Sequence, residues 1–129
     1  MNDHKRTVLI VEDVDDCATT LEIALSTIRN VTVRHANTAE SALKTLEEEP
    51  VSVLITDVHL PVMDGFELLS TIRRHPRHSS VPILVISGDA DPATPSRALK
   101  LGANAFFGKP YSPAAVRLKI EELIHANGK

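Results

Sequence analysis

The sequence has 129 residues, a length typical of one domain that buries about two thirds of its unfolded surface on folding. Hydrophobic residues make up 43% and charged residues 24%, an ordinary globular composition that excludes a disordered chain. The sequence has fourteen Lys and Arg residues and seventeen Asp and Glu residues, so no excess of positive charge favours direct binding of nucleic acid. A single cysteine, Cys17, and the lack of a long apolar segment predict a reduced, cytoplasmic protein away from membranes.

Short aliphatic segments alternate with helical patterns along the chain. Residues 8–11, 51–55 and 83–86 are apolar and rich in β-branched side chains, which predicts central parallel strands covered on both faces. Residues 31–35 alternate between apolar and polar side chains, as in a half-exposed edge strand, and residues 104–107 are a fifth candidate strand.

The segments between these strands predict helices, and the whole pattern predicts an α/β (βα)5 domain over residues 1–129 with a core at about 7–125. Such alternation implies parallel strands joined by right-handed crossovers. The fourth helix is expected to begin at Thr94-Pro95 and to end at Leu101, because a proline inside a helix is costly.

Polar side chains stand where the predicted strands end. Glu12 and Asp13 follow the first strand, Asp57 the third, Ser87 the fourth and Lys109 the fifth. Because ligands of open parallel sheets bind at the carboxyl ends of the strands, these groups are expected to share one edge.

These residue types suit phosphoryl transfer. Neighbouring carboxylates repel one another unless a cation compensates them, and Mg²⁺ prefers one or two carboxylates together with waters and a phosphate oxygen. Lys109 offers a compact positive charge for phosphate, and Ser87 offers a neutral donor. The set therefore predicts a phosphoryl-transfer site with a carboxylate nucleophile.

From Val8 to about Ile124 the sequence resembles the receiver domain of two-component response regulators. The motifs that carry the resemblance are Glu12-Asp13, Asp57 followed by Leu60-Pro61-Val62-Met63-Asp64-Gly65, Ser87, and Phe106 followed by Lys109-Pro110. The resemblance implies a doubly wound, flavodoxin-like three-layer sandwich with five helices around a parallel sheet in the order 2-1-3-4-5.

The resemblance also implies residue roles. Asp57 is then the phosphoacceptor for a phosphoryl group from a histidine kinase, and Lys109 pairs with the phosphoryl oxygens. Mg²⁺ is bound by Asp13, Asp57 and the backbone carbonyl of His59, with Glu12 acting directly or through water.

The remaining implied roles concern the switch. Ser87 bonds a phosphoryl oxygen and moves, and the rotamer of Phe106 reports that movement. The bond before Pro110 is expected to be cis. Phosphorylation then reshapes the face formed by the fourth helix, fifth strand and fifth helix, which controls a partner.

Two other functions compete with this interpretation. The first is a phosphorylation-independent pseudo-receiver that only docks a partner, against which the complete set of site residues argues. The second is a small α/β hydrolase or phosphatase, but the sequence has no G-x-S-x-G elbow, and His59 stands where a second Asp is needed. We do not expect the protein to be an enzyme in the ordinary sense, because the domain would catalyse only its own phosphorylation and dephosphorylation.

The expected partners are a sensor histidine kinase or phosphotransfer protein and a downstream protein of unknown identity. Many transcription-factor receivers carry an acidic pair where this chain has Asn104-Ala105, so a monomer is expected. Whether the domain stands alone or belongs to a larger regulator or hybrid kinase is left open. The charged stretches 47–49 and 73–78 are interpreted as solvated helix ends, and none of the six histidines has H-E-x-x-H spacing.

Overall fold

The computed structural model describes residues 5–127, in which five strands alternate with five helices. The elements are β1 (Arg6–Val11), α1 (Asp15–Leu25), β2 (Val31–Ala36), α2 (Ala39–Glu48), β3 (Val53–Asp57), α3 (Gly65–Arg74), β4 (Ile83–Ser87), α4 (Thr94–Lys100), β5 (Ala105–Gly108) and α5 (Pro113–Asn127). The outermost residues of the domain expected over 1–129, namely 1–4 and 128–129, lie outside the described residues.

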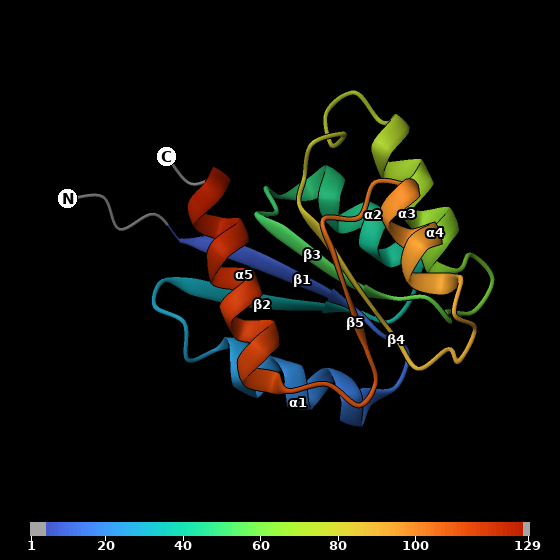
Figure 1. Cartoon of the computed structure of the whole chain (residues 1–129). Helices are drawn as coiled ribbons and strands as arrows, with labels where there is room; N and C mark the ends of the chain where they lie inside the picture. Colours follow the sequence, from blue (N-terminus) through green and yellow to red (C-terminus); the bar gives the residue numbers. More distant parts are fainter. Residues whose placement is uncertain (1–4, 128–129) are drawn as a thin grey trace.

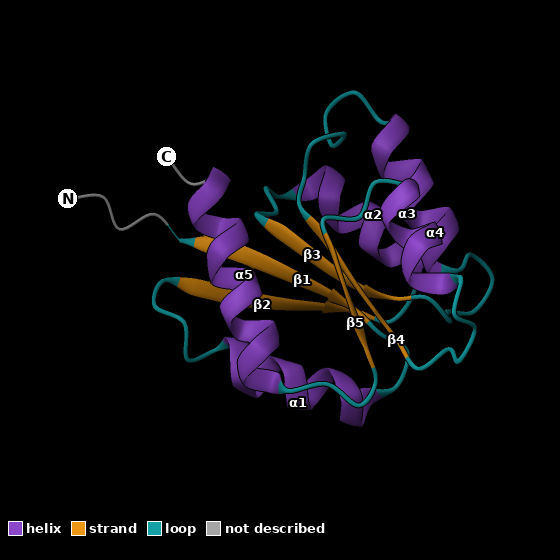
Figure 2. Ribbon diagram, viewed as in Figure 1, coloured by secondary structure: helices purple, strands orange, loops and turns teal. Residues whose placement is uncertain are grey.

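The strands form one parallel sheet in the order β2-β1-β3-β4-β5, which confirms the predicted flavodoxin-like architecture. The sheet is the middle of three layers, with α1 and α5 on one face and α2, α3 and α4 on the other (Figures 1 and 2). Side chains of β1 alternate between the faces: Val8 and Ile10 pack under α1 and α5, whereas Leu9 and Val11 pack under α2 to α4.

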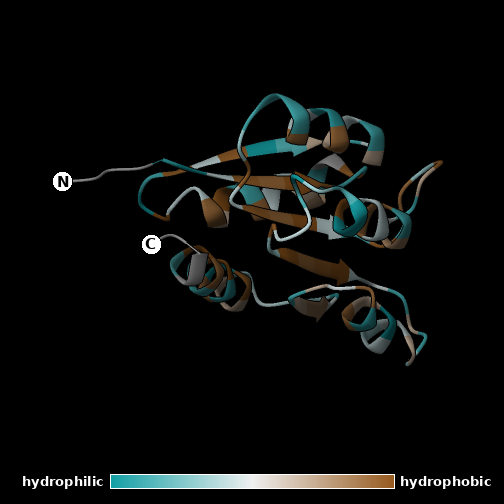
Figure 3. Cartoon of the chain, turned by 90° about the horizontal axis from the view of Figure 1, so that it is seen from above, coloured by the Kyte–Doolittle hydropathy of each residue, from teal (hydrophilic) through white to brown (hydrophobic). Residues whose placement is uncertain are grey.

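Burial follows the predicted strand positions. Every residue of β3 and β4 is buried, as expected for central strands, and the mostly apolar centre of the sheet is visible in Figure 3. β2 is half-exposed, as predicted for an edge strand. The third strand begins two residues later than predicted, at Val53, and it extends to Asp57, so the polar residue ends the strand instead of following it.

Local signals explain where the helices begin. Thr38 caps α2 by accepting the Ser41 N–H, and Asp64 and Glu67 form a reciprocal capping box at the start of α3. α4 begins at Thr94 as predicted, and it ends one residue earlier than expected. Among the helices within residues 5–127, none is long and apolar enough to cross a membrane.

Candidate functional site

Two buried carboxylates and one ammonium group meet at the carboxyl edge of the sheet. Glu12 follows β1 and is 5% exposed, and Asp57 ends β3 and is 7% exposed. Lys109, which follows β5, places its Nζ 2.5 Å from Asp57 Oδ2 and 3.3 Å from Glu12 Oε1. Of the five residues predicted to share this edge, the ammonium of Lys109 thus contacts two, Glu12 and Asp57.

The backbone around Asp57 fixes the position of its carboxylate. The backbone N–H of His59 donates to Asp57 Oδ1 at 2.9 Å, which leaves Oδ2 facing Lys109. The chain then turns sharply into α3, and the N–H of Gly65 donates to the Val58 carbonyl at 2.8 Å. A Cβ atom on Gly65 would lie 2.2 Å from the Asp57 carbonyl oxygen, so only glycine fits this close approach.

The charges at this edge do not balance. Burial raises the pKa of the Glu12 carboxyl, the negative charge of Asp57 raises it further, and Lys109 partly opposes both effects. Burial alone would lower the pKa of the Lys109 ammonium, but the hydrogen bonds and charges of Asp57 and Glu12 outweigh burial and raise it. One ammonium thus faces two buried carboxylates, and when both are ionised a further cation would balance the remaining negative charge.

The donor set fits a hard divalent cation. Carboxylate oxygens at a solvent-open edge are what Mg²⁺ prefers, because it keeps several waters and takes one or two carboxylates. Asp13 is exposed next to Glu12, where its carboxylate is free to complete such a set. His59 is also exposed, and its imidazole lies 3.4 Å from the Asp89 carboxylate.

Ser87 lies in the wall of the site but bonds its own loop. It is the last residue of β4 and is 1% exposed. Its Oγ accepts the Asp89 N–H at 3.0 Å, and its carbonyl accepts the Lys109 N–H at 2.9 Å. Phe106 of β5 is partly buried and packs against the hydrophobic cluster under α2 to α4. The peptide bond between Lys109 and Pro110 is cis.

The structure thus brings Glu12, Asp57 and Lys109 into direct contact and leaves Asp13 and His59 exposed at the rim. Sequence reasoning missed two supports of Glu12. The N–H of Val14 lies 3.3 Å from Glu12 Oε2, and the His35 ring lies 2.8 Å from the Glu12 carbonyl oxygen. The parallel pairing of β1 with β2 sets Ile10 opposite His35, so the adjacent strand ends were the signal for the second support.

A second group of ligand-type side chains was also missed. Among the described residues, Glu47, His75 and His78 have ligand atoms that all lie within 4.8 Å of one another, and they belong to a different part of the molecule. The short spacing of His75 and His78 was the only sequence signal for this group.

Comparison with known proteins gives the family. Residues 8–121 match the family described as the response regulator receiver domain, and the chain belongs to this family. Receiver domains are signalling modules of two-component systems and not enzymes that turn over a separate substrate.

Individual relatives agree with this assignment. The chain is 35% identical to the transcriptional regulatory protein GltR of Pseudomonas aeruginosa over 124 residues, which are 96% of this chain and 51% of GltR. The chain therefore spans about half the length of that relative. It is 30% identical to a probable chemotaxis protein CheY of Rhizobium etli over 119 residues, which are 92% of each protein.

Solved structures give the same result. A putative response regulator from Chloroflexus aurantiacus is 31% identical, with a TM-score of 0.88 over 94% of this chain and 98% of that chain. The chemotaxis response regulator CheY4 of Vibrio cholerae has a TM-score of 0.83 at 24% identity over 92% of this chain and 98% of that chain, which shows the shared fold.

Proposed function

We propose that this receiver domain accepts a phosphoryl group on Asp57 with the help of Mg²⁺. The observation that carries the proposal is the contact of Lys109 with two buried carboxylates at the end of the central strands. The phosphoryl donor is a phosphohistidine on a sensor histidine kinase or a phosphotransfer protein. Mg²⁺ is held by Asp13, Asp57 and the backbone carbonyl of His59, with Glu12 acting directly or through water.

The transfer is a displacement at phosphorus. A carboxylate oxygen of Asp57 attacks the phosphorus of the donor, the P–N bond breaks, and the leaving electron pair stays on the donor imidazole. The product is an acyl phosphate on Asp57. A Mg²⁺ ion held at this edge would neutralise the charge that develops on the phosphoryl oxygens. Lys109, already 2.5 Å from Oδ2, exchanges its carboxylate partner for a phosphoryl oxygen and stabilises the product.

The phosphoryl group then acts on the surface by favouring one of two conformations. Ser87 is the sensor, because its hydroxyl can donate to a phosphoryl oxygen while it still accepts the Asp89 N–H. Movement of this loop gives Phe106 room to turn inward, which changes the face formed by α4, β5 and α5. The partner that reads this face is a downstream protein of the same signalling pathway.

The test is phosphorylation by acetyl phosphate in the presence of Mg²⁺. The wild-type chain should acquire one acid-stable, hydroxylamine-sensitive label, and Asp57→Asn should remove it. Asp16→Asn is the matched control, because Asp16 is exposed in the first turn of α1 and should label like the wild type. Equal labelling of Asp57→Asn would contradict the proposal, and an unlabelled wild type would favour a phosphorylation-independent docking module.

A further inference from the structure

Glu47, His75 and His78 converge at the edge of the sheet opposite to Asp57. Glu47 lies near the end of α2, whereas His75 and His78 follow the end of α3. A surface hollow of about 580 Å³ adjoins Glu47 and His78, and Ser52 and Pro82, which directly precede β3 and β4, also line it. The cluster therefore lies at the amino ends of the strands, away from the candidate phosphorylation site.

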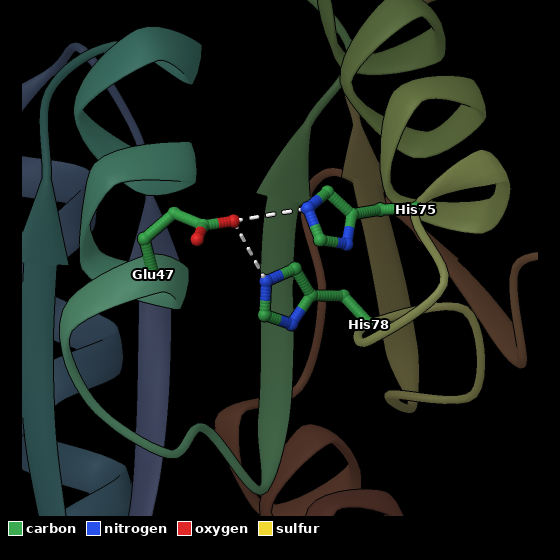
Figure 4. A group of neighbouring side chains, drawn as sticks. All are labelled: Glu47, His75 and His78. Carbon is green, nitrogen blue, oxygen red and sulfur yellow. Dashed lines mark hydrogen bonds and ion pairs between the residues drawn. The ribbon is translucent and has the colours of Figure 1, made fainter.

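Both rings point toward the same oxygen atom (Figure 4). His75 Nε2 lies 3.0 Å and His78 Nε2 lies 3.2 Å from Glu47 Oε2. The two imidazoles are stacked with their centroids 4.3 Å apart and an interplanar angle of 30°, and both Nε2 atoms lie close to the same carboxylate oxygen. Three potential ligand atoms thus occupy one small region of the surface.

This spacing is close to that of a zinc site. Tetrahedral zinc with bonds of 2.0–2.1 Å holds its ligand atoms about 3.3 Å apart, and the two distances from Glu47 Oε2 are already near that value. Two histidines and one glutamate leave the fourth position for water, as at open zinc sites. The side chains of Glu47 and His75 are 46% and 35% exposed, so that position is open to solvent.

Two contacts of Arg77 affect this coordination in different ways. The guanidinium of Arg77 pairs with Glu47 Oε1, which leaves Oε2 to bind a metal through one oxygen only. The backbone N–H of Arg77 donates to His75 Nδ1 at 3.2 Å, which places the ring proton on Nε2. Metal binding at Nε2 requires this proton to move to Nδ1, which can then no longer accept the Arg77 N–H, so this hydrogen bond is lost when the metal bond forms.

We propose that Glu47, His75 and His78 bind one Zn²⁺ ion, and that the ion ties α2 to the segment between α3 and β4. The ligand chemistry separates this site from the acidic edge. Imidazole nitrogens favour zinc and other late transition metals, whereas Mg²⁺ requires oxygen ligands. The zinc site and the proposed magnesium site therefore differ in metal preference and in position.

The test is calorimetric titration of the full chain with Zn²⁺ in the presence of excess Mg²⁺, which saturates the acidic edge. We expect one Zn²⁺ per chain, accompanied by shifts of the ring proton signals of His75 and His78 in NMR spectra. His75→Ala and His78→Ala should each weaken zinc binding at least tenfold. Loss of a residue that only hydrogen-bonds to a metal ligand already lowers metal affinity about tenfold or more, so loss of a ligand should lower it at least as much.

His125→Ala is the matched control, because His125 is exposed at the end of α5 and should leave zinc binding unchanged. Circular dichroism verifies that each variant is folded, and Glu47→Gln provides a ligand change without loss of volume. Absence of zinc binding in the wild type would overturn the proposal. Unchanged affinity in both His75→Ala and His78→Ala would also overturn it, because zinc would then be bound elsewhere.

Discussion

Replacement of Lys109 tests the electrostatics of the acidic edge directly. The Lys109 ammonium is the positive partner of Asp57 and Glu12, whose side chains are only 7% and 6% exposed. Lys109→Met keeps most of the apolar stem and removes the charge. No positive charge then offsets the repulsion between the two carboxylates. This repulsion destabilises the folded state but not the unfolded state, in which the carboxylates are far apart.

The expected loss in the free energy of unfolding can be estimated from the burial of the ion pair. Removal of one partner of a buried ion pair costs about 3–5 kcal/mol. Lys109 keeps 26% of its side chain exposed, so water screens part of the effect and we expect a value near the lower limit, about 3 kcal/mol. For a domain of this size, that loss corresponds to a fall in melting temperature of roughly 10 °C.

The assay is urea unfolding with divalent metals chelated. Lys119→Met is the matched control, because Lys119 pairs with Glu122 on the exposed surface of α5 at 3.0 Å, and loss of such a pair costs less than about 0.5 kcal/mol. Excess Mg²⁺ should recover part of the stability of Lys109→Met by neutralising the carboxylates. Equal destabilisation of the two variants would refute the argument that Lys109 compensates buried charge.

Two further substitutions test the metal ligands and the turn after β3. Asp13→Ala should weaken Mg²⁺ binding about tenfold or more in a calorimetric titration, because it deletes an oxygen ligand and part of the negative charge that attracts the ion. Unchanged Mg²⁺ affinity would show that Asp13 is not a ligand. Gly65→Ala should destabilise the fold by about 2 kcal/mol in urea unfolding, because the new methyl group meets the Asp57 carbonyl. Gly88→Ala is the control, since a Cβ there meets Lys109 Cβ at an ordinary 3.7 Å.

The fold and the acidic edge were predictable because both depend on local patterns. Short apolar segments that end in polar residues define strands, and parallel strands carry their carboxyl ends to one edge. Glu12, Asp57 and Lys109 are far apart in sequence, yet each one stands at or next to the end of its own strand. Topology alone therefore brings them together, and side-chain detail is not needed to predict their neighbourhood.

Contacts between helix ends and loops were not predictable in this way. The prediction of a solvated helix end over residues 73–78 is wrong for Arg73. Its guanidinium donates to the Gly102 carbonyl at 2.8 and 3.0 Å and to Asn104 Oδ1 at 3.0 Å. Glu47 likewise reaches His78, 31 residues away in sequence. These pairs depend on how α2, α3 and α4 pack, and hydrophobic periodicity does not encode that packing.

Hydrogen bonds in the loop after β4 indicate how a change at Ser87 reaches α4. A series of local hydrogen bonds leads from the site to the start of this helix: the Asp89 N–H donates to Ser87 Oγ, the Asp91 N–H to Asp89 Oδ1, and the Ala93 N–H to Asp91 Oδ1. The other end of α4 is anchored, because Arg73 holds the Gly102 carbonyl that follows it. Movement of Ser87 should therefore displace the beginning of α4 more than its end.

Beryllofluoride, a phosphoryl mimic, makes this expectation measurable by NMR. In the wild type, signals of residues 87–97 and of Phe106 should shift more than those of α2, and those of residues 101–104 should shift little. Ser87→Ala should still bind the mimic but lose most of the response at Phe106, because the alanine cannot donate to the mimic or accept the Asp89 N–H. Ser80→Ala, on an exposed loop, should respond like the wild type. A full response of Phe106 in Ser87→Ala would show that the signal leaves the site by another route.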